Sequence, residues 1–432
     1  MTSEGATQTA IEAAITGVGR PLEGVRVLSM EQAAALPFAT RHLADLGAEV
    51  IRVEAPNRAP RVIGVDLFRN KRRIALDLSQ DAGPEAFRRI AATCDVVAHN
   101  FTPRVMRKFG IDYPGIQALR NDVIYVSLTG FGTTGPWGER PLFGPGAESI
   151  SGQNDLIGEA DAWPGRPGTI VYADNICGLH ALTAILGALE RRGRTGEGQH
   201  IDISLYETAV SQIGATVAER AFAGNQPQRA GNLDTRYAVH DVFTAAGEDR
   251  HVALTAATGQ LAAVGTALGL EGEPSREAIA AAIGQRAAED VAPALQAEGI
   301  AASVVADASD HLSDEHLWTR SYFGVLDLNL PGLAGGFPQA GPVWGGGAPA
   351  LDHPQTIGAS TRAVLLEVGY DGGEVDALFA AGVAVEFEEA LPARGAATVA
   401  EELRVARGEL ARTVGPDDVR ARWLAAKNGR SS

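Results

Sequence analysis

The carboxylate of Asp174 stands at the start of a long apolar segment. An arginine- and glycine-rich run at 192–199 ends that segment, and an alternating, strand-like sequence follows at 201–205. Between them, apolar residues recur at roughly helical spacing, namely Ile176, Leu179, Leu186 and Leu189. The pattern therefore predicts a helix that begins at or near Asp174.

Two roles for Asp174 follow from that position, and they are compatible. An aspartate at the N-cap accepts hydrogen bonds from unpaired backbone N–H groups and stabilises a helix by about 1 kcal/mol. On spacing alone, this structural role is the commoner one. A helix N-terminus also lowers the pKa of a carboxylate and offers N–H donors to a developing oxyanion, so Asp174 could attack a thioester or another acyl group.

Several ordered segments carry a resemblance to a known family. Asp-x-x-x-Gly-x-His at 174–180, followed by an apolar helix, Arg-x-Gly-x-Gly-Gln at 194–199 and the I-D-I-S-L strand, resembles the family III CoA-transferases. That family includes formyl-CoA transferase and the carnitine CoA-transferases. The resemblance runs from roughly residue 21 to 385 and is densest up to about 215. Its other matching segments lie at 21–28, 43–56, 70–78, 95–101 and 130–136.

The resemblance implies a CoA-transferase with Asp174 as its nucleophile. In the family mechanism, the aspartate attacks an acyl-CoA thioester to give a mixed anhydride, and the released CoA thiolate then forms an aspartyl-CoA thioester. An acceptor acid reverses these steps. The implied partners are an acyl-CoA and a small carboxylic acid; coenzyme A is a substrate, and no permanently bound cofactor or metal is needed.

The resemblance also implies where CoA binds. Lys71 and Arg72 occupy positions that face the CoA phosphates in the family, and Arg104 brings a guanidinium near the same region. Gly130 and Gly132 belong to a turn whose backbone N–H groups could approach the thioester or CoA. Without the resemblance, a basic cluster is more often a solvated face and a glycine-rich turn is often only a turn.

Departures from the family pattern bear on specificity. Gly144 stands where relatives often have an acidic residue, Glu148 where they have glutamine, and Ala34 where formyl-CoA transferase has a polar side chain. These changes put a small diacid such as oxalate in doubt as substrate. Phe143 replaces the proton-exchanging histidine of the related α-methylacyl-CoA racemases, which disfavours racemase activity. The alternatives are an acyl-CoA racemase, isomerase or lyase of the same superfamily, or a non-catalytic CoA-binding protein.

Two histidines have simpler interpretations. His180 lies more than a turn and a half beyond Asp174 along the predicted helix, so we expect a packed residue rather than a general base. His99 follows a predicted strand, where α/β sheets place ligands, although a satisfied loop histidine is the commoner case.

Composition indicates a large acidic protein. The formal net charge of -16 over 432 residues argues against a nucleic-acid or polyanionic-surface partner. Cys94 and Cys177 each lie in an apolar stretch without metal-ligand spacing, so we expect core thiols and a reducing compartment. There is no apolar run of about 18 residues and no secretory signal, which predicts a cytoplasmic protein without a membrane partner.

Alternating strands and helices predict an α/β fold with a large, Rossmann-like, open parallel-sheet domain and a smaller α+β domain. The turn after the first strand lacks the glycines of a dinucleotide site. Family resemblance implies an interlocked homodimer, and implies that the chain returns to the large domain after a second linker. The expected boundaries are 1–20 (disordered extension), 21–213 (large domain), 214–235 (linker), 236–328 (small domain), 329–350 (linker) and 351–432 (return, with a helical tail).

Individual elements can also be placed. Strands are predicted at 25–29, 49–53, 73–78, 94–98 and 122–128, and helices at 36–46 and 83–92. In the small domain, the pattern favours hairpin strands within 239–254 and alanine-rich helices within 274–298. Residues 331–349 hold too much glycine and proline for a regular element, and helices are expected in the tail at 399–412 and 416–427.

Overall fold

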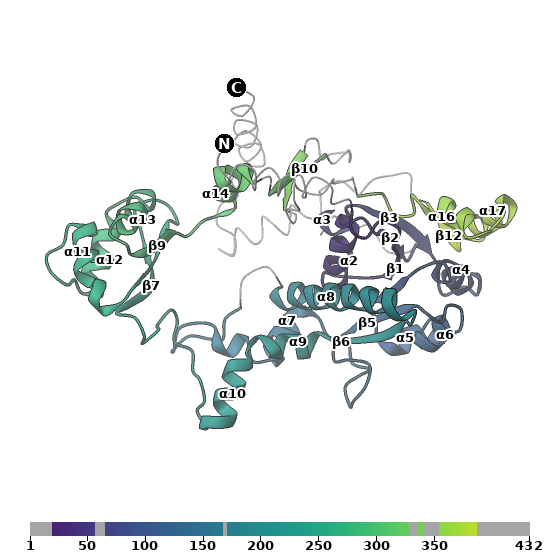
Figure 1. Ribbon diagram of the computed structural model, residues 1–432, viewed down its shortest axis with the longest axis horizontal. Helices are drawn as coiled ribbons and strands as arrows, with labels where there is room; N and C mark the ends of the chain where they lie inside the picture. The colour runs from purple at the N-terminus through teal and green to yellow at the C-terminus, as the bar shows by residue number, and fades with distance from the viewer. Residues whose placement is uncertain are drawn as a thin grey trace, which may run out of the picture. The chain divides into compact units, whose positions relative to one another are not determined.

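The computed structural model describes residues 20–56, 65–166, 171–320, 322–327, 336–340 and 354–386. The chain divides into two compact units (Figure 1). The second unit holds the described residues 154–166 and 215–314, and the first unit holds the rest. The expected extension at 1–20, except Arg20, and the expected tail helices at 399–412 and 416–427 lie outside the described residues.

A seven-stranded sheet forms the centre of the first unit, in the order β12-β3-β2-β1-β4-β5-β6. Neighbouring strands are parallel, except that β12 runs antiparallel to β3 at one edge. The strands are β1 (Arg26–Met30), β2 (Glu49–Glu54), β3 (Lys71–Leu76), β4 (Val96–His99), β5 (Ile124–Thr129), β6 (Gln199–Ser204) and β12 (Ala384–Val385). The predicted α/β class with an open parallel sheet is confirmed.

Helices cover both faces of this sheet, which is why its central strands read as continuous apolar runs (Figure 1). Alternate residues of β1, β2, β4 and β5 enter two separate cores, as the two-residue period of a strand requires. One face packs against α2 (Ala35–Asp45) and α8 (Tyr172–Thr195). The other face packs against α4 (Ala82–Ala91), α5 (Pro103–Lys108), α6 (Tyr113–Gln117), α16 (Thr361–Glu367) and α17 (Gly372–Ala380).

The apolar helix predicted after Asp174 is confirmed as α8, which ends at Gly196 in the left-handed conformation, with φ of 71°. Its neighbour α2 approaches closely at Gly178. A Cβ atom at Gly178 would lie 2.6 Å from the carbonyl oxygen of Ala35, so only glycine allows this contact. Three further helices of the first unit are α3 (Val65–Phe68), α7 (Gly144–Ile150) and α9 (Leu205–Gln212), and a fourth is α15 (Glu315–Thr319).

The second unit has its own core and its own antiparallel sheet. The strands β7 (Val239–Thr244), β8 (His251–Ala256) and β9 (Ala301–Val304) pair in that order, which confirms the predicted hairpin. The helices α11 (Leu261–Leu268), α12 (Arg276–Gly284) and α13 (Ala288–Ala297) pack on it, and α14 (Ala308–Ser313) follows. The alanine-rich helices expected within 274–298 are therefore present. Helix α10 (Gly214–Ala223) follows α9 in the chain and precedes β7.

Two expectations about elements are wrong in part. Residues 336–340 form strand β11 (Gly336–Ala340), which pairs antiparallel with β10 (Phe323–Asp327), so the glycine- and proline-rich stretch contains a regular element. Proline is compatible with that strand because each strand of a two-stranded sheet has a free edge. Strand β3 begins at Lys71 rather than 73, since its first charged residues are part of the strand. No described helix combines the length and apolarity needed to span a bilayer.

Candidate active site

Asp174 is the third residue of α8 and is buried, with 7% of its surface exposed. The N-cap is Val171, and no side chain caps the helix there. The interpretation of Asp174 as the capping residue is therefore wrong, because its side chain lies inside the first turn rather than before it. Its place is not explained by helix capping.

Burial decides the ionisation of Asp174. Removal from water, helped by the nearby negative charge of Glu148, raises the pKa of the Asp174 carboxyl group to about 6. The expectation that this pKa is lowered is wrong, because burial raises it and the charge of Glu148 adds to the effect. At neutral pH the group is still mostly ionised, and it is more basic than an ordinary aspartate, so it can act as a nucleophile.

Helix α7 presents two residues to the first turn of α8. A Cβ atom at Gly144 would lie 2.6 Å from Asp174 Oδ2 and 1.9 Å from Val171 Cγ1, so the backbone of α7 touches the carboxylate. One helical turn further, Glu148 is completely buried, and its Oε1 accepts a hydrogen bond of 3.4 Å from the Ala173 N–H. Two positions that depart from the family pattern thus meet at Asp174.

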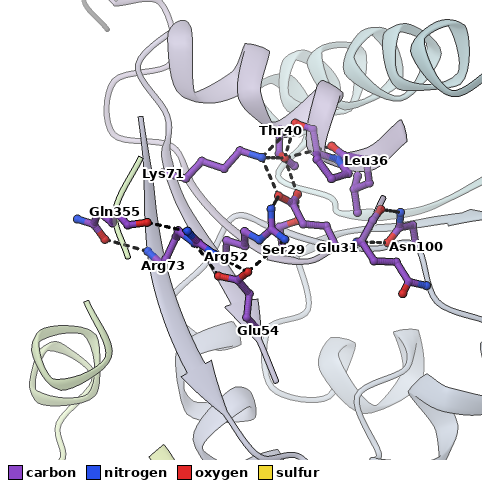
Figure 2. Close-up of polar contacts among 12 residues, drawn as sticks. Ser29, Glu31, Leu36, Thr40, Arg52, Glu54, Lys71, Arg73, Asn100 and Gln355 are labelled. Carbon is purple, nitrogen blue, oxygen red and sulfur yellow. Dashed lines mark hydrogen bonds and ion pairs between the residues drawn. The ribbon is translucent and has the colours of Figure 1, made fainter. Parts of the chain in front are cut away.

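Lys71 lies away from solvent in a charged cluster beneath α2 (Figure 2). Its Nζ donates to Glu31 Oε1 at 2.7 Å, to Thr40 Oγ1 at 2.6 Å and to the Pro37 carbonyl at 3.0 Å. Burial, only partly offset by Glu31, lowers the pKa of the Lys71 amine to about 8. All three donors of the ammonium are used within the chain, so a contact with CoA would require Lys71 to leave these acceptors.

The other predicted basic residues are closer to solvent. Arg72 is a quarter exposed and pairs with Glu49 and with Glu367, whose Oε1 lies 2.7 Å from Arg72 Nη2. Arg104 is exposed on α5, and its backbone N–H bonds Glu139 Oε2 at 3.0 Å. Since the guanidinium of Arg104 has no hydrogen bond or ion pair among the described residues, it is the predicted residue most open to an anionic ligand.

Gly130 and Gly132 follow β5 in a tight turn. A Cβ atom at Gly130 would lie 2.6 Å from Leu142 Cβ, and Gly132 has a φ of +83°, so both positions require glycine for structural reasons. Leu142 comes two residues before Gly144, which links this turn to the contact with Asp174. Lys71 and Arg72 lie on β3, four strands from β5 in the sheet, and are not brought to the same place.

Sequence reasoning missed the charged cluster that holds Lys71. Burial alone would raise the pKa of Glu31, but Lys71 and Arg52 outweigh it and lower that pKa. Arg52 lies 3.5 Å from Glu31 and 3.3 Å from Glu54 (Figure 2). The available signal was the two-residue period, because alternate positions place polar or charged side chains on one face. They are Ser29 on β1 with Glu31 just after it, Arg52 and Glu54 on β2, and Lys71 and Arg73 on β3.

Both cysteines and one of the two candidate histidines are buried, and the other histidine is exposed. Cys94 and Cys177 are buried free thiols, as predicted. His99 ends β4 and is buried; burial lowers its pKa to about 3, and its Nε2 lies 2.9 Å from Ser127 Oγ. His180 is exposed on α8, so the expectation of a packed residue is wrong.

Comparison with known proteins agrees with this fold. The model of CoA-transferase family III matches residues 22–344. A crystal structure of a CaiB/BaiF family protein from Brucella suis superposes with a TM-score of 0.72 at 27% identity, covering 81% of this chain and 99% of that one. By its fold, the protein is an α/β protein with a parallel sheet, and its candidate site is built around an aspartate on a helix. The chain belongs to CoA-transferase family III.

Curated relatives in this family act on CoA thioesters. The succinyl-CoA:glutarate CoA-transferase of Mus musculus is 33% identical over 237 residues, which is 52% of this chain and 54% of that protein. The succinate–glutarate CoA-transferase of Agrobacterium fabrum is 34% identical over 52% of this chain and 61% of its own length. An acetyl-CoA:oxalate CoA-transferase of Acetobacter aceti is 31% identical over 52% and 61%. The chain thus matches little more than half the length of these relatives.

Replacing Asp174 by asparagine should stabilise the protein at neutral and higher pH. Because the folded state raises the pKa of Asp174 from 3.8 to about 6, it binds this proton more tightly than the unfolded chain does. Stability therefore falls as pH rises from about 4 to about 6, and the deficit persists above that range. We expect Asp174→Asn to gain on the order of 1–3 kcal/mol at pH 8, with a smaller gain near pH 5.

Urea unfolding of both proteins across that pH range measures the difference. The matched control is Asp81→Asn, the same change at an exposed position, which should leave stability within about 0.5 kcal/mol. A loss of stability in Asp174→Asn at pH 8 would contradict the conclusion that burying the ionised Asp174 carboxylate destabilises the folded protein.

Proposed function

We propose that this protein transfers CoA from an acyl-CoA thioester to a carboxylic acid, with Asp174 as the covalent nucleophile. The observation that supports this most directly is a buried carboxylate with a pKa of about 6 in the first turn of a long helix. An ordinary solvated aspartate would be a weaker nucleophile, and a fully neutral one would not attack at all. Family membership supplies the reaction class.

The proposed steps use only acyl exchange. The Asp174 carboxylate attacks the thioester carbonyl carbon, and the C–S bond breaks to release CoA thiolate and leave a mixed anhydride. The thiolate then attacks the aspartyl carbonyl carbon, which expels the donor carboxylate and forms an aspartyl-CoA thioester. The acceptor carboxylate attacks that thioester, and the released thiolate takes the acceptor's acyl group, which regenerates Asp174. One difficult transfer becomes several easier ones.

The substrate class is proposed from the relatives. Their names pair CoA with succinate, glutarate and oxalate, which are short dicarboxylates. Succinyl-CoA is therefore the first donor to test. Gly144 supplies no acidic side chain beside Asp174, so the acceptor preference need not follow that of oxalate-specific enzymes.

CoA binding is proposed to involve the exposed basic residues and the β5 turn. Arg104 and Arg72 can reach solvent, whereas Lys71 is held by Glu31. Lys71, Gly130 and Gly132 also belong to the proposed CoA site, and Lys71 must give up its present acceptors to contact a phosphate. We expect Arg104 to contribute more directly to CoA binding than Lys71, because its guanidinium is already exposed.

A homodimer is proposed because α10 has an apolar stripe and no buried residue. Phe222 is 92% exposed and Val217 is 48% exposed, at the spacing that places them on one side of the helix with Ala218 and Ala221. A stripe of this kind commonly marks a protein contact. A second copy of the chain is the partner that the family resemblance implies.

Asp174→Asn should abolish CoA transfer, and Asp174→Ala should do the same. The reason is that an amide cannot form the anhydride, although asparagine keeps the size of the side chain. Mass spectrometry after incubation with succinyl-CoA should find a CoA adduct on the peptide that contains Asp174 in the wild-type protein and none in either variant. Full activity of Asp174→Asn would refute the nucleophile.

A second assay separates the alternative functions. With a chiral 2-methylacyl-CoA in deuterated water, transfer to a free acid without deuterium at the α-carbon fits the proposed reaction. Deuterium uptake with loss of chirality and no CoA transfer would instead support a racemase. Binding of CoA with neither reaction would support a non-catalytic protein.

Arg104→Ala and Lys71→Ala should fail in different ways. Loss of a charge-assisted phosphate contact costs about 1.5–3 kcal/mol, so Arg104→Ala should weaken CoA binding about 10- to 100-fold, and the difference should shrink with added salt. Lys71→Ala leaves Glu31 buried without its closest cation and should cost about 3–5 kcal/mol of stability.

Calorimetric titration of CoA and urea unfolding measure the two effects. Arg194→Ala, an exposed arginine at the end of α8, is the control and should change neither. Unchanged CoA affinity in Arg104→Ala would show that Arg104 is a solvated surface residue that does not contact CoA.

The mass in solution should be about twice 45.0 kDa by sedimentation equilibrium. Replacing Val217 and Phe222 together by serine should shift the protein towards monomer, because the apolar stripe of α10 would lose its largest side chains. Glu219→Gln, on the same helix, is the control. A monomer at micromolar concentration in the wild-type protein would contradict the proposal.

A further inference from the structure

Helix α7 contacts the candidate nucleophile at two levels. At its first turn, the Gly144 backbone lies so close to Asp174 that a Cβ atom would be 2.6 Å from Oδ2. At its second turn, Glu148 projects from the same side of the helix, because residues four apart are neighbours on a helix surface. Glu148 has no exposed surface, and its Oε1 bonds the N–H of Ala173, the residue before Asp174.

Within the part of the chain that the structure describes, two titratable groups can be placed near Asp174. Glu148 acts on it from α7 and Cys177 lies one turn along α8. The contact from α2 consists of the Ala35 carbonyl and Phe38 against Gly178, and α9 presents Thr208 to Cys177. Burial keeps the Cys177 thiol protonated by raising its pKa to about 12. Among the described residues, Glu148 is therefore the charged group that acts most directly on Asp174.

We propose that Glu148 is a positioning residue for Asp174: its buried carboxylate holds the first turn of α8 through the Ala173 N–H and sets a second negative charge beside the nucleophile. This inference rests on the proposed function. It gives a role to a position that the reaction itself does not use.

The charge of Glu148 acts differently along the reaction. In the free enzyme it repels the Asp174 carboxylate. When Asp174 becomes an anhydride or a thioester it carries no charge, and the negative charge leaves on the thiolate or the released acid. The repulsion is thus relieved as the acyl bond forms, so Glu148 destabilises the ground state more than the transition state, which raises kcat rather than affinity.

The test is the pH profile of CoA-adduct formation in a single turnover with succinyl-CoA. The wild-type protein should lose activity on the acid side with an apparent pKa near 6. Glu148→Gln keeps an oxygen that can accept from Ala173 N–H but removes the charge. Its acid limb should move to lower pH, and its rate at pH 8 should fall by less than about tenfold with KM little changed, as expected for a less basic nucleophile.

The controls distinguish failure of the proposed function from failure of the proposed role of Glu148. Glu190→Gln, an exposed change on α8, should keep the wild-type profile. An absent adduct in the wild-type protein would overturn the proposed function. An adduct with an unshifted acid limb in Glu148→Gln would overturn the role of Glu148 alone. If Glu148→Gln fails to fold, the wild-type profile decides, since an acid limb near 4, the ordinary range of an aspartate, contradicts the proposal.

Discussion

Close helix approach around the first turns of α8 is the constraint on which the candidate site depends. Gly178 lets α2 pack against α8 with the Ala35 carbonyl in contact, and Gly144 does the same for α7. A side chain at either position would push a helix away by the width of a methyl group or more. Asp174 lies buried where α2 and α7 approach α8 this closely, and neither glycine carries a side chain that would prevent the approach.

The position of α2 also depends on the buried charged cluster beneath it, where the sheet carries charged side chains instead of apolar ones. The pair of Lys71 and Glu31 has no exposed side-chain surface, and Thr40 donates to the same carboxylate as Ser29 does. Such a cluster is a poor source of stability, because desolvation offsets most of the attraction. It does fix geometry, since every donor of Lys71 has one acceptor, and it anchors the segment between β1 and α2 that leads to Ala35.

The parts of this structure that could be predicted from sequence are those governed by local periodicity. Strands β1 and β2 and helices α2, α4 and α8 follow from apolar spacing. All but α8, which was predicted only to begin at or near Asp174, lie within two residues of their predicted bounds. The start of β3 was placed two residues late because Lys71 and Arg72 do not look like part of a buried strand until their partners Glu31 and Glu49 are known. Strand β11 was missed because its pairing with β10, rather than its composition, makes it regular.

The candidate site shows the same division. Asp174 stands out in the sequence because a carboxylate opens an apolar helix, and its position on α8 follows from that pattern. Its ionisation does not follow, because desolvation and Glu148 are properties of the packed structure and they reverse the sign expected from the helix dipole. Gly144 and Glu148 looked like losses of acidic and amide groups. In the structure they form one surface of α7, where Gly144 leaves room for the Asp174 carboxylate and the charge of Glu148 adds to the effect of burial on the Asp174 pKa. The chemistry of Asp174 therefore depends on α7 in two ways: on the absence of a side chain at Gly144 and on the charge of Glu148.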